Sequence, residues 1–431
     1  MARASAPGEG EEWKTVSEPI EVTIERIGHD GDGVAELAGR PVFVPFTVPG
    51  DRVRIALDGA RGHVLARLAD GPERAEPRCR HFSVCGGCQL QHLSGAAYAA
   101  WKRAQVEHVL AQRGIKEALV AALISLPPGT RRRTALSFQR TKAGGVLGFH
   151  KARRHDLVDV EECPVLLPAI VARLADLRDW LAELFAPGSQ GMLALLQTEG
   201  GLDVALTLSR APEDARRLRL ALAEGAQKLD LARVALDGEV VVERRPPVLH
   251  IAGLALVPPP GAFLQASAEA ERVLTELVLA GVGTARRVAD LFAGLGTFSL
   301  AIAKHAVVQA VDANAELVAA LSKAARHAQG LKPITVETRD LFRAPLDAET
   351  LSRFDAVVLD PPRAGARAQA ETLAASAVPR AVAVSCNPAS FARDARILLD
   401  GGFRLDWARP VDQFLWSAEI ELVAQFSRKA R

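Results

Sequence analysis

Apolar and polar residues alternate with a period of two along residues 20–65, which is the pattern of half-buried β-strands. Turn signals divide this region at residues 29–33, 38–40, 49–51 and 58–59. The pattern predicts five short strands in about fifty residues, which is typical of a small closed barrel of the oligonucleotide-binding type. Such barrels often bind RNA, although many are plain interaction modules.

The pattern of apolar residues in the last third of the chain predicts strands that alternate with helices. This alternation indicates a Rossmann-like α/β domain. The glycine turn A-G-L-G-T-F follows the first of these strands, and the second strand ends at Asp312. Ser299 takes the place of the third glycine of a dinucleotide fingerprint, so nicotinamide binding is disfavoured. Gly294 and Gly296 still allow a ligand close to the backbone, and an acid about 20 residues further on can bind ribose hydroxyls. The expected strands are residues 286–292, 307–311, 354–359, 380–385, 403–407 and 419–426.

Cys386 lies between the expected strand 380–385 and a helix that begins at Asn387 and Pro388 and ends at Gly401 and Gly402. Ligands bind at the carboxyl edge of an open α/β sheet, and a helix N-terminus favours a thiolate. The position therefore suits a reactive thiol. The alternative is a small core residue, since free cysteine is among the most buried residue types.

Two carboxylates accompany this thiol. Asp360 follows the expected strand 354–359 within D-P-P-R, so it shares the edge of Asp290, the glycine turn, Asp312 and Cys386. A turn or helix cap is the structural alternative for an Asp before two prolines. Glu421 lies in the apolar context S-A-E-I-E-L-V-A, where an unpaired carboxylate would be unfavourable.

The other four cysteines form a possible ligand set. Cys79, Cys85 and Cys88 lie in C-R-H-F-S-V-C-G-G-C, and Cys163 follows in E-E-C-P. Three thiols in a glycine-containing loop and a distant fourth suit one tetrahedral metal site or one iron–sulfur cluster, and spacing alone does not separate the two. A hairpin over residues 193–208 and helical patterns follow.

Residues 131–154, between Cys88 and Cys163, contain eight basic residues and no acidic one. A charge run is often only a solvated face. If the four cysteines close on one centre, however, this run folds beside them and forms a basic surface able to hold RNA phosphates. The expected RNA-binding residues are Arg131, Arg132, Arg133, Lys151, Arg153 and Arg154.

Composition limits the class of protein. A chain of 431 residues has room for two to four domains, and 49% hydrophobic with 24% charged residues is ordinary for a globular protein. Few cysteines, an odd number of them, and no run of about 20 apolar residues or signal peptide predict a cytoplasmic protein without a membrane span. The net charge of +2 does not by itself imply a nucleic-acid partner. We expect a monomer with no obligate protein partner.

The combination of a thiol, a nucleoside-type turn and two carboxylates suits carbon methylation of a pyrimidine. Carbon 5 of uracil is a poor nucleophile until a thiolate adds to carbon 6, and a base must later remove the proton from carbon 5. Cys386 and Glu421 would fill these two roles. Nitrogen methylation needs no such thiolate, so Cys386 discriminates between the two reactions.

The sequence resembles the RNA uracil-5-methyltransferases, which use S-adenosylmethionine and act on ribosomal or transfer RNA. The resemblance runs from about residue 20 to residue 426. It includes a TRAM barrel, C-x5-C-G-G-C with a later cysteine, F-L-Q, D-L-F-A-G-L-G-T-F, R-D-L-F, L-D-P-P-R-A-G and S-C-N-P. It implies a four-cysteine [4Fe–4S] cluster and a uracil flipped into the active site.

The resemblance also assigns roles to individual residues. It implies that Cys386 is the nucleophile, Glu421 the base, and Asp360 the residue at the polar edge of the uracil and in contact with the cofactor. The cluster ligands would be Cys79, Cys85, Cys88 and Cys163. The remaining cofactor contacts would be Gln265, Phe292, Gly294, Gly296, Asp312 and Asp340.

Two positions depart from the family pattern, Ser267 in place of Asn and Glu419 in place of His. On a strand, Glu419 and Glu421 would face the same side, and the pKa of one carboxyl would rise. The domains expected are a disordered tail (1–17), a TRAM barrel (18–72), a central α+β cluster and RNA-binding domain (73–255) and a Rossmann-like methyltransferase domain (256–431).

The expected reaction is methylation of carbon 5 of a uridine in RNA, with 23S ribosomal RNA as the first expectation. Transfer RNA and nitrogen methylation of an RNA base are the enzymatic alternatives. A non-catalytic RNA-binding protein is a further alternative, but it leaves the set of Cys386, Asp360 and Glu421 unexplained.

Overall fold

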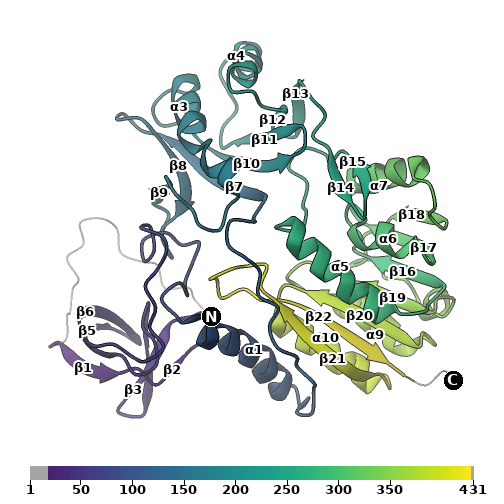
Figure 1. The fold of residues 1–431 in the computed structure, drawn as a ribbon, viewed down its shortest axis with the longest axis horizontal. Helices are drawn as coiled ribbons and strands as arrows, with labels where there is room; N and C mark the ends of the chain where they lie inside the picture. The colour runs from purple at the N-terminus through teal and green to yellow at the C-terminus, as the bar shows by residue number, and fades with distance from the viewer. Residues whose placement is uncertain (1–17, 429–431) are drawn as a thin grey trace.

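The computed structural model describes residues 18–428, so the expected tail 1–17 lies outside the described residues. Within this range the strands form four sheets, of six, seven, two and seven strands. Figure 1 shows the purple N-terminal barrel and the green and yellow C-terminal sheet on opposite sides, with the central sheet above them. The α/β fold class with its N-terminal barrel is as the sequence predicts.

The N-terminal sheet is a barrel that closes where its first strand changes partner. Thr23 pairs with Arg52 of the fifth strand. Two residues later the partner is the third strand, because the Glu25 N–H donates to the Val34 carbonyl oxygen at 2.8 Å. This change splits the predicted first strand in two, so the barrel has six strands and not five. They are β1 (Ile20–Thr23), β2 (Arg26–Ile27), β3 (Gly33–Leu37), β4 (Arg40–Val44), β5 (Arg52–Asp58) and β6 (Arg61–Ala69).

The central sheet has the order β13-β12-β11-β10-β7-β8-β9. Its core joins the sheet to the helices, through residues such as Leu136, Leu193, Leu177 and Leu222. The predicted hairpin is present, with Thr198 paired with Gly201. The strands are β7 (Arg133–Arg140), β8 (Gly145–His150), β9 (Leu157–Asp159), β10 (Gln190–Thr198), β11 (Gly201–Leu208), β12 (Arg233–Leu236) and β13 (Glu239–Glu243), and the helices are α2 (Pro168–Val171), α3 (Leu174–Leu184) and α4 (Ala215–Lys228).

Helix α1 (Gly95–Gln112) and the segment after it pack on the C-terminal unit. Val106 and Leu110 share a core with Phe391 and Phe426, and Val120 and Ile124 form bridges with Ala408 and Val411. In Figure 1, α1 lies beside the C-terminal sheet. The segment 73–255, which we expected to form one central domain, thus contributes a helix to the core of another unit.

The C-terminal sheet has the order β18-β17-β16-β19-β20-β22-β21, in which β22 runs antiparallel to both of its neighbours and the first five strands are parallel. Its strands are β16 (Arg287–Leu291), β17 (Val307–Asp312), β18 (Ile334–Thr338), β19 (Ala356–Leu359), β20 (Arg380–Ser385), β21 (Arg404–Val411) and β22 (Glu421–Ser427). Its helices are α5 (Ala268–Val282), α6 (Thr297–Ile302), α7 (Ala315–His327), α8 (Ala348–Leu351), α9 (Arg367–Ala375) and α10 (Pro388–Asp400).

Two separate cores cover the faces of this sheet, one under α9 and α10 and the other under α5 and α6. A small hairpin, β14 (Leu249–Ile251) and β15 (Leu254–Leu256), packs beside α6 and α7. Covering both faces leaves the carboxyl ends of the parallel strands as the open edge. Within residues 18–428, no helix is both long and apolar enough to cross a membrane.

Candidate active site

The glycine turn forms the first part of the site, at the carboxyl end of β16. Phe292, Gly294 and Gly296 all have positive φ, and Gly296 caps the N-terminus of α6. A Cβ atom at Gly296 would collide with Leu321, whereas nothing lies within 4 Å of a Cβ built at Gly294. Gly296 is therefore required for packing, and Gly294 is the position where a ligand can approach the backbone.

The expected cofactor acids lie next to this turn. Asp312 accepts hydrogen bonds from the Gly294 N–H at 2.9 Å and the Asn314 N–H at 2.8 Å. The Arg339 N–H donates to the Asp312 carbonyl oxygen at 2.9 Å, which brings the neighbouring Asp340 to the same edge. The ring of Phe292 lies 5.5 Å from that of Phe342, centroid to centroid. The structure thus brings Phe292, Gly294, Asp312 and Asp340 together.

Asp290 is fully buried beneath the turn. Its Oδ2 accepts a hydrogen bond from the Ser299 hydroxyl at 2.5 Å, while Oδ1 has no hydrogen-bond partner. Burial, together with the charge of Asp312, raises the pKa of Asp290 to about 7. Ser299, which replaces the third fingerprint glycine, therefore has a specific structural role, because its hydroxyl satisfies one oxygen of a buried carboxyl group.

Cys386 lies between β20 and α10, as predicted. The Asn387 side chain accepts from the Ala389 N–H at 3.0 Å and donates to the Arg363 carbonyl oxygen at 3.0 Å. These bonds cap α10 and join the cysteine turn to the D-P-P-R loop. The boundaries of this strand and helix, including Gly401 as the C-cap, agree with the sequence-based prediction.

The electrostatic setting of Cys386 differs from the expectation of a stabilised thiolate. Burial and the charges of Glu421 and Asp360 raise the pKa of the thiol to about 11, against the opposing effect of the Arg363 guanidinium. The physical reason is first the burial of the thiol and then the two carboxylates that face it. In the free enzyme Cys386 is therefore a protonated thiol near neutral pH.

Glu421 begins β22 and is 3% exposed. Burial and the nearby Asp360 hold its pKa well above the usual range, and a hydrogen bond from Gln413 opposes them. The side chain of Glu419, by contrast, is 41% exposed and pairs with Arg363 at 2.9 Å. The expectation that Glu419 and Glu421 face the same side is wrong, because Glu419 lies in the loop before the strand.

Asp360 faces both halves of the site. Burial and the charges of Asp290 and Asp312 raise its pKa to about 7. Gln265 donates from Nε2 to Asp360 Oδ2 at 3.4 Å, and Gln413 donates to Gln265 Oε1 at 3.0 Å and to Glu421. Sequence reasoning missed Gln413, because it lies in an irregular loop with no motif to mark it.

The four remaining cysteines are free thiols that line one cavity of about 380 Å³. Burial raises the pKa of all four thiols. Within the described range, no group of three or more His, Cys, Asp or Glu side chains is arranged to hold a metal ion. The four thiols are Cys79, Cys85, Cys88 and Cys163.

The cysteine loop, residues 79–93, also contacts the loop that precedes β22. The Gln89 and Leu90 N–H groups both donate to the Trp416 carbonyl oxygen, at 2.8 and 2.9 Å. The Ala418 N–H in turn donates to Gln89 Oε1 at 3.3 Å. On its other side the cysteine loop reaches the barrel, where Phe82 lies 5.2 Å from Phe46, ring centroid to ring centroid.

The structure separates the expected RNA-binding residues into two groups. Arg132 is buried and pairs with Glu271 at 2.6 Å, so it is not available to a phosphate. Arg131 and Arg133 line the cysteine cavity, and Arg133 also lies 4.3 Å from the centre of the Phe263 ring. The second group lines a separate, larger cavity and consists of Lys151, Arg153 and Arg154.

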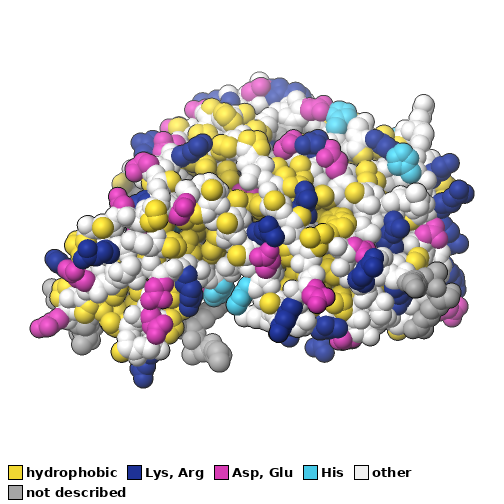
Figure 2. All heavy atoms as spheres, turned by 60° about the horizontal axis from the view of Figure 1, so that its bottom comes forward, with side chains coloured by type: hydrophobic (Ala, Val, Ile, Leu, Met, Phe, Trp, Pro, Cys, Tyr) yellow, Lys and Arg dark blue, Asp and Glu magenta, His cyan; other side chains and the backbone are white. Residues whose placement is uncertain are grey.

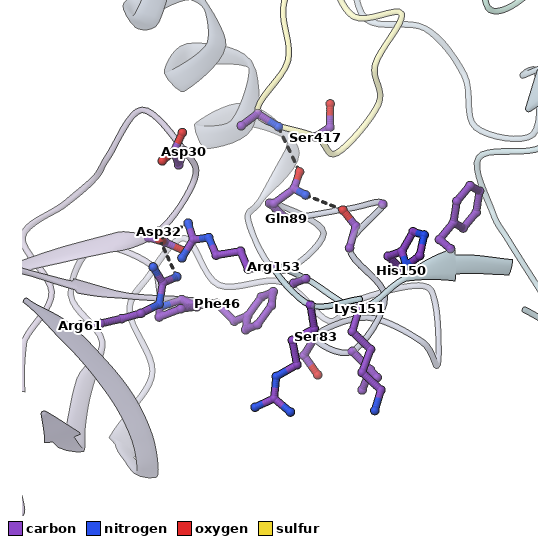
Figure 3. A pocket seen from close by; sticks show the side chains of 18 of the residues that line it. Asp30, Asp32, Phe46, Arg61, Ser83, Gln89, His150, Lys151, Arg153 and Ser417 are labelled. Atoms are coloured by element: carbon purple, nitrogen blue, oxygen red, sulfur yellow. Dashed lines mark hydrogen bonds and ion pairs between the residues drawn. The ribbon is translucent and has the colours of Figure 1, made fainter. Parts of the chain in front are cut away.

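This larger cavity, about 1500 Å³, lies between the barrel, the cysteine loop and the β8–β9 loop, and Glu419 reaches its wall. Figure 3 shows Arg61 and Arg153 converging on Asp32, with Phe46, His150 and Lys151 around the opening. Both guanidinium groups lie 2.9 Å from Asp32 Oδ2. Elsewhere, on the face in Figure 2, Lys and Arg side chains are interspersed with Asp and Glu. The lining of the cavity itself combines Arg61, Lys151, Arg153 and Arg154 with the acidic residues Asp30, Asp32, Asp58 and Glu419, so its charge is mixed.

Comparison with known proteins identifies the class. Residues 20–61 match the TRAM domain of tRNA (uracil(54)-C(5))-methyltransferase, and residues 255–384 match the methyltransferase small domain. The crystal structure of the tRNA (uracil-54, C5)-methyltransferase of Pyrococcus abyssi with S-adenosyl-L-homocysteine has a TM-score of 0.72 and 22% identity, over 94% of this chain and all of that one. The fold and site thus define a methyltransferase with a TRAM barrel.

Two relatives identify the family. An uncharacterized RNA methyltransferase of Brucella suis is 47% identical over 96% of this chain and 99% of its own length. The 23S rRNA (uracil(1939)-C(5))-methyltransferase RlmD of Chromohalobacter salexigens is 35% identical over 94% of this chain and 89% of its own. The chain belongs to the RNA methyltransferase family and is an enzyme.

Proposed function

We propose that the protein methylates carbon 5 of a uridine in RNA, with S-adenosylmethionine as methyl donor and 23S ribosomal RNA as substrate. The observation that carries the proposal is the group formed by the half-buried Cys386 and Asp360 and the buried Glu421, since each of the two carboxylates acts on the pKa of that thiol. Nitrogen methylation has no use for this thiol. The name of the Chromohalobacter salexigens relative supports ribosomal RNA as the substrate.

The reaction begins with the addition of Cys386 to carbon 6 of the uracil. As the sulfur–carbon bond forms, the thiol proton passes to Asp360, and the electron pair of the C5–C6 double bond moves toward O4. An Asp360 carboxyl with a pKa of about 7 exists in both protonation states near neutral pH, which suits this exchange. When bound, S-adenosylmethionine would supply the methyl group for carbon 5 and would be released as S-adenosylhomocysteine.

Glu421 completes the reaction as the base. It takes the proton from carbon 5, the C5–C6 double bond forms again, and the bond between carbon 6 and the Cys386 sulfur breaks. The thiolate then recovers its proton from Asp360, and one proton is released to solvent per turnover. A raised pKa makes the Glu421 carboxylate a stronger base than an exposed glutamate.

The cofactor lies, in our proposal, along the carboxyl edge of β16, β17 and β18. Gly294 leaves open space for it, and Asp312 and Asp340 flank the same turn. The contacts assigned are Gln265, Phe292, Gly294, Gly296, Asp312, Asp340 and Asp360.

We further propose that the RNA strand beside the target uridine binds in the 1500 Å³ cavity. Lys151, Arg153 and Arg154 supply positive charge there, and Phe46 offers a ring for base stacking. Asp32, which holds Arg61 and Arg153 in the free protein, would yield these guanidinium groups to phosphates.

The four cavity thiols hold, in our proposal, an iron–sulfur cluster. They share one cavity of about 380 Å³, and the positive charge of Arg131 lies close enough to lower the pKa of Cys163. Because the surrounding loop contacts the barrel and the Trp416 loop, we assign the cluster a structural role.

Transfer RNA is the second candidate substrate, because the TRAM match is to a domain of a transfer RNA methyltransferase. The deciding experiment is anaerobic methyl transfer from labelled S-adenosylmethionine to separated unmodified ribosomal and transfer RNA, with nucleoside analysis. We expect 5-methyluridine in ribosomal RNA. Label in transfer RNA alone would support the second candidate, and a nitrogen-methylated base would refute the proposed chemistry.

A further inference from the structure

Gln413 has a buried amide that joins three segments of the active site. Its Oε1 accepts from the Ala266 N–H at 3.1 Å, and its Nε2 donates to Gln265 Oε1 at 3.0 Å and to Glu421 Oε2. The amide thus accepts one hydrogen bond through its oxygen and donates two through its NH₂ group. Gln265 extends the chain of hydrogen bonds to Asp360.

The direction of these hydrogen bonds follows from one backbone group. The Ala266 N–H can only donate, so the Gln413 atom that faces it must be the oxygen. The Gln413 NH₂ group therefore points at Gln265 and Glu421. Gln265 in turn must present its oxygen to Gln413 and its NH₂ group to Asp360. Both carboxyl groups of the site are consequently held by amide donors of fixed orientation.

A buried ion pair holds the backbone of this loop. Asp412, the residue before Gln413, accepts from the Lys102 ammonium at 2.5 Å and the Tyr98 hydroxyl at 2.8 Å. The Tyr98 hydroxyl oxygen also accepts from the Trp416 N–H at 2.8 Å. Helix α1 thereby fixes the start of the loop, so the neighbouring Gln413 side chain has a rigid support.

We propose that Gln413 is a positioning residue for the methyl transfer, holding Glu421 by one oxygen so that the other faces carbon 5 of the uracil. This inference rests on the proposed function and adds a residue to it. By occupying Oε2, the amide leaves Oε1 to take the proton. Through Gln265 it also aligns Asp360, so one side chain positions both carboxyl groups.

The same hydrogen bond sets the pH at which Glu421 is active. Glu421 is faced by Asp360 and by the Cys386 thiol, and the charge of Arg363 acts on that thiol. The Gln413 donor lowers the pKa of Glu421 against burial and the charge of Asp360. Loss of the donor raises this pKa, so the ionised base is then present only at higher pH. The acid limb of the rate profile must therefore move up in pH.

The test compares Gln413→Met with Gln369→Met. Gln369 is a matched control in α9: its buried amide also accepts from one backbone N–H, that of Leu346, and donates two hydrogen bonds. For Q413M we expect kcat to fall about tenfold or more with the KM for RNA changed less than about threefold. We also expect an upward shift of the acid limb and accumulation of an SDS-stable protein–RNA adduct.

A second variant, Gln413→Leu, also removes the donor to Glu421 without adding a charge, and it gives the same test if Q413M does not fold. Suppose that both variants have the kcat and the acid limb of Q369M while the wild type forms 5-methyluridine. This result would overturn the inference about Gln413 and leave the proposed function intact. A wild type that forms no 5-methyluridine would overturn the proposed function and the inference with it.

Discussion

The two cysteine-containing regions of this protein place their thiols in different electrostatic settings. Cys386 lies at a regular strand–helix junction and faces the carboxylates of Glu421 and Asp360. The four cavity thiols lie outside the named helices and strands, face one another, and have the positive charge of Arg131 beside Cys163. The first setting suits a single thiol that is ionised only as it reacts, and the second is the setting of the cluster that we propose. Burial alone, common to both, does not define a role.

The sharpest test of this difference is Cys386→Ala. We expect product formation to fall at least about a thousandfold, because no other group can add to carbon 6. Iron content and thermal stability should stay near those of the wild type. The measurement is labelled methyl transfer with nucleoside analysis, and substantial 5-methyluridine from the variant would refute the role of Cys386.

Glu421→Gln should have the next largest effect, a fall in turnover of about a hundredfold to ten-thousandfold. The methyl group still transfers, but the proton on carbon 5 stays and the bond to Cys386 does not break. Denaturing gels should therefore show protein covalently bound to RNA. Normal turnover without this adduct would assign the base to another residue. Glu419→Gln is the control, because it removes a nearby negative charge without removing the proposed base.

Cys163→Ser tests the other region. Protein purified without oxygen should lose most of its iron and inorganic sulfide, and its free energy of unfolding should fall by at least about 3 kcal/mol. Cys386→Ser is the matched control and should retain both elements. Equal iron contents in the two variants would show that the cavity thiols do not bind a shared cluster.

The smallest expected effect concerns the pH dependence of Cys386 itself. In the free enzyme its alkylation should rise with pH toward a midpoint near the thiol pKa of about 11. Asp360→Asn removes a negative charge that raises this pKa, so the midpoint should move to lower pH. Peptide mass spectrometry after iodoacetamide treatment separates Cys386 from the cavity thiols. An unchanged midpoint would mean that Asp360 does not act on the thiol.

The sequence predicts best where local signals set the structure. Asn387, Pro388 and Gly401 mark the ends of α10, so the placement of Cys386 follows from residues within one short segment. The glycine turn and Asp312 are predictable for the same reason. The fold class follows from the strand and helix pattern.

Prediction from the sequence fails where contacts between residues far apart in the chain determine the structure. Arg132 is buried because Glu271, 139 positions away, pairs with it. Glu419 and Glu421 diverge because the strand begins only after Glu419, although the sequence suggested an earlier start. The role of Gln413 depends on the adjacent residues Gln265 and Ala266 and on Glu421, which come from two separate segments. None of these pairings leaves a periodic or motif signal in the chain.

The hydrogen bonds from Gln89 and Leu90 to Trp416 have a consequence for how such enzymes can diverge. They tie a segment that lines the 1500 Å³ cavity to the loop that precedes β22. A change of substrate preference that reshapes the cysteine loop must therefore keep its fit to residues 412–419. Grafting residues 85–93 alone from a relative should yield poorly active hybrids, and exchanging both segments together should restore activity.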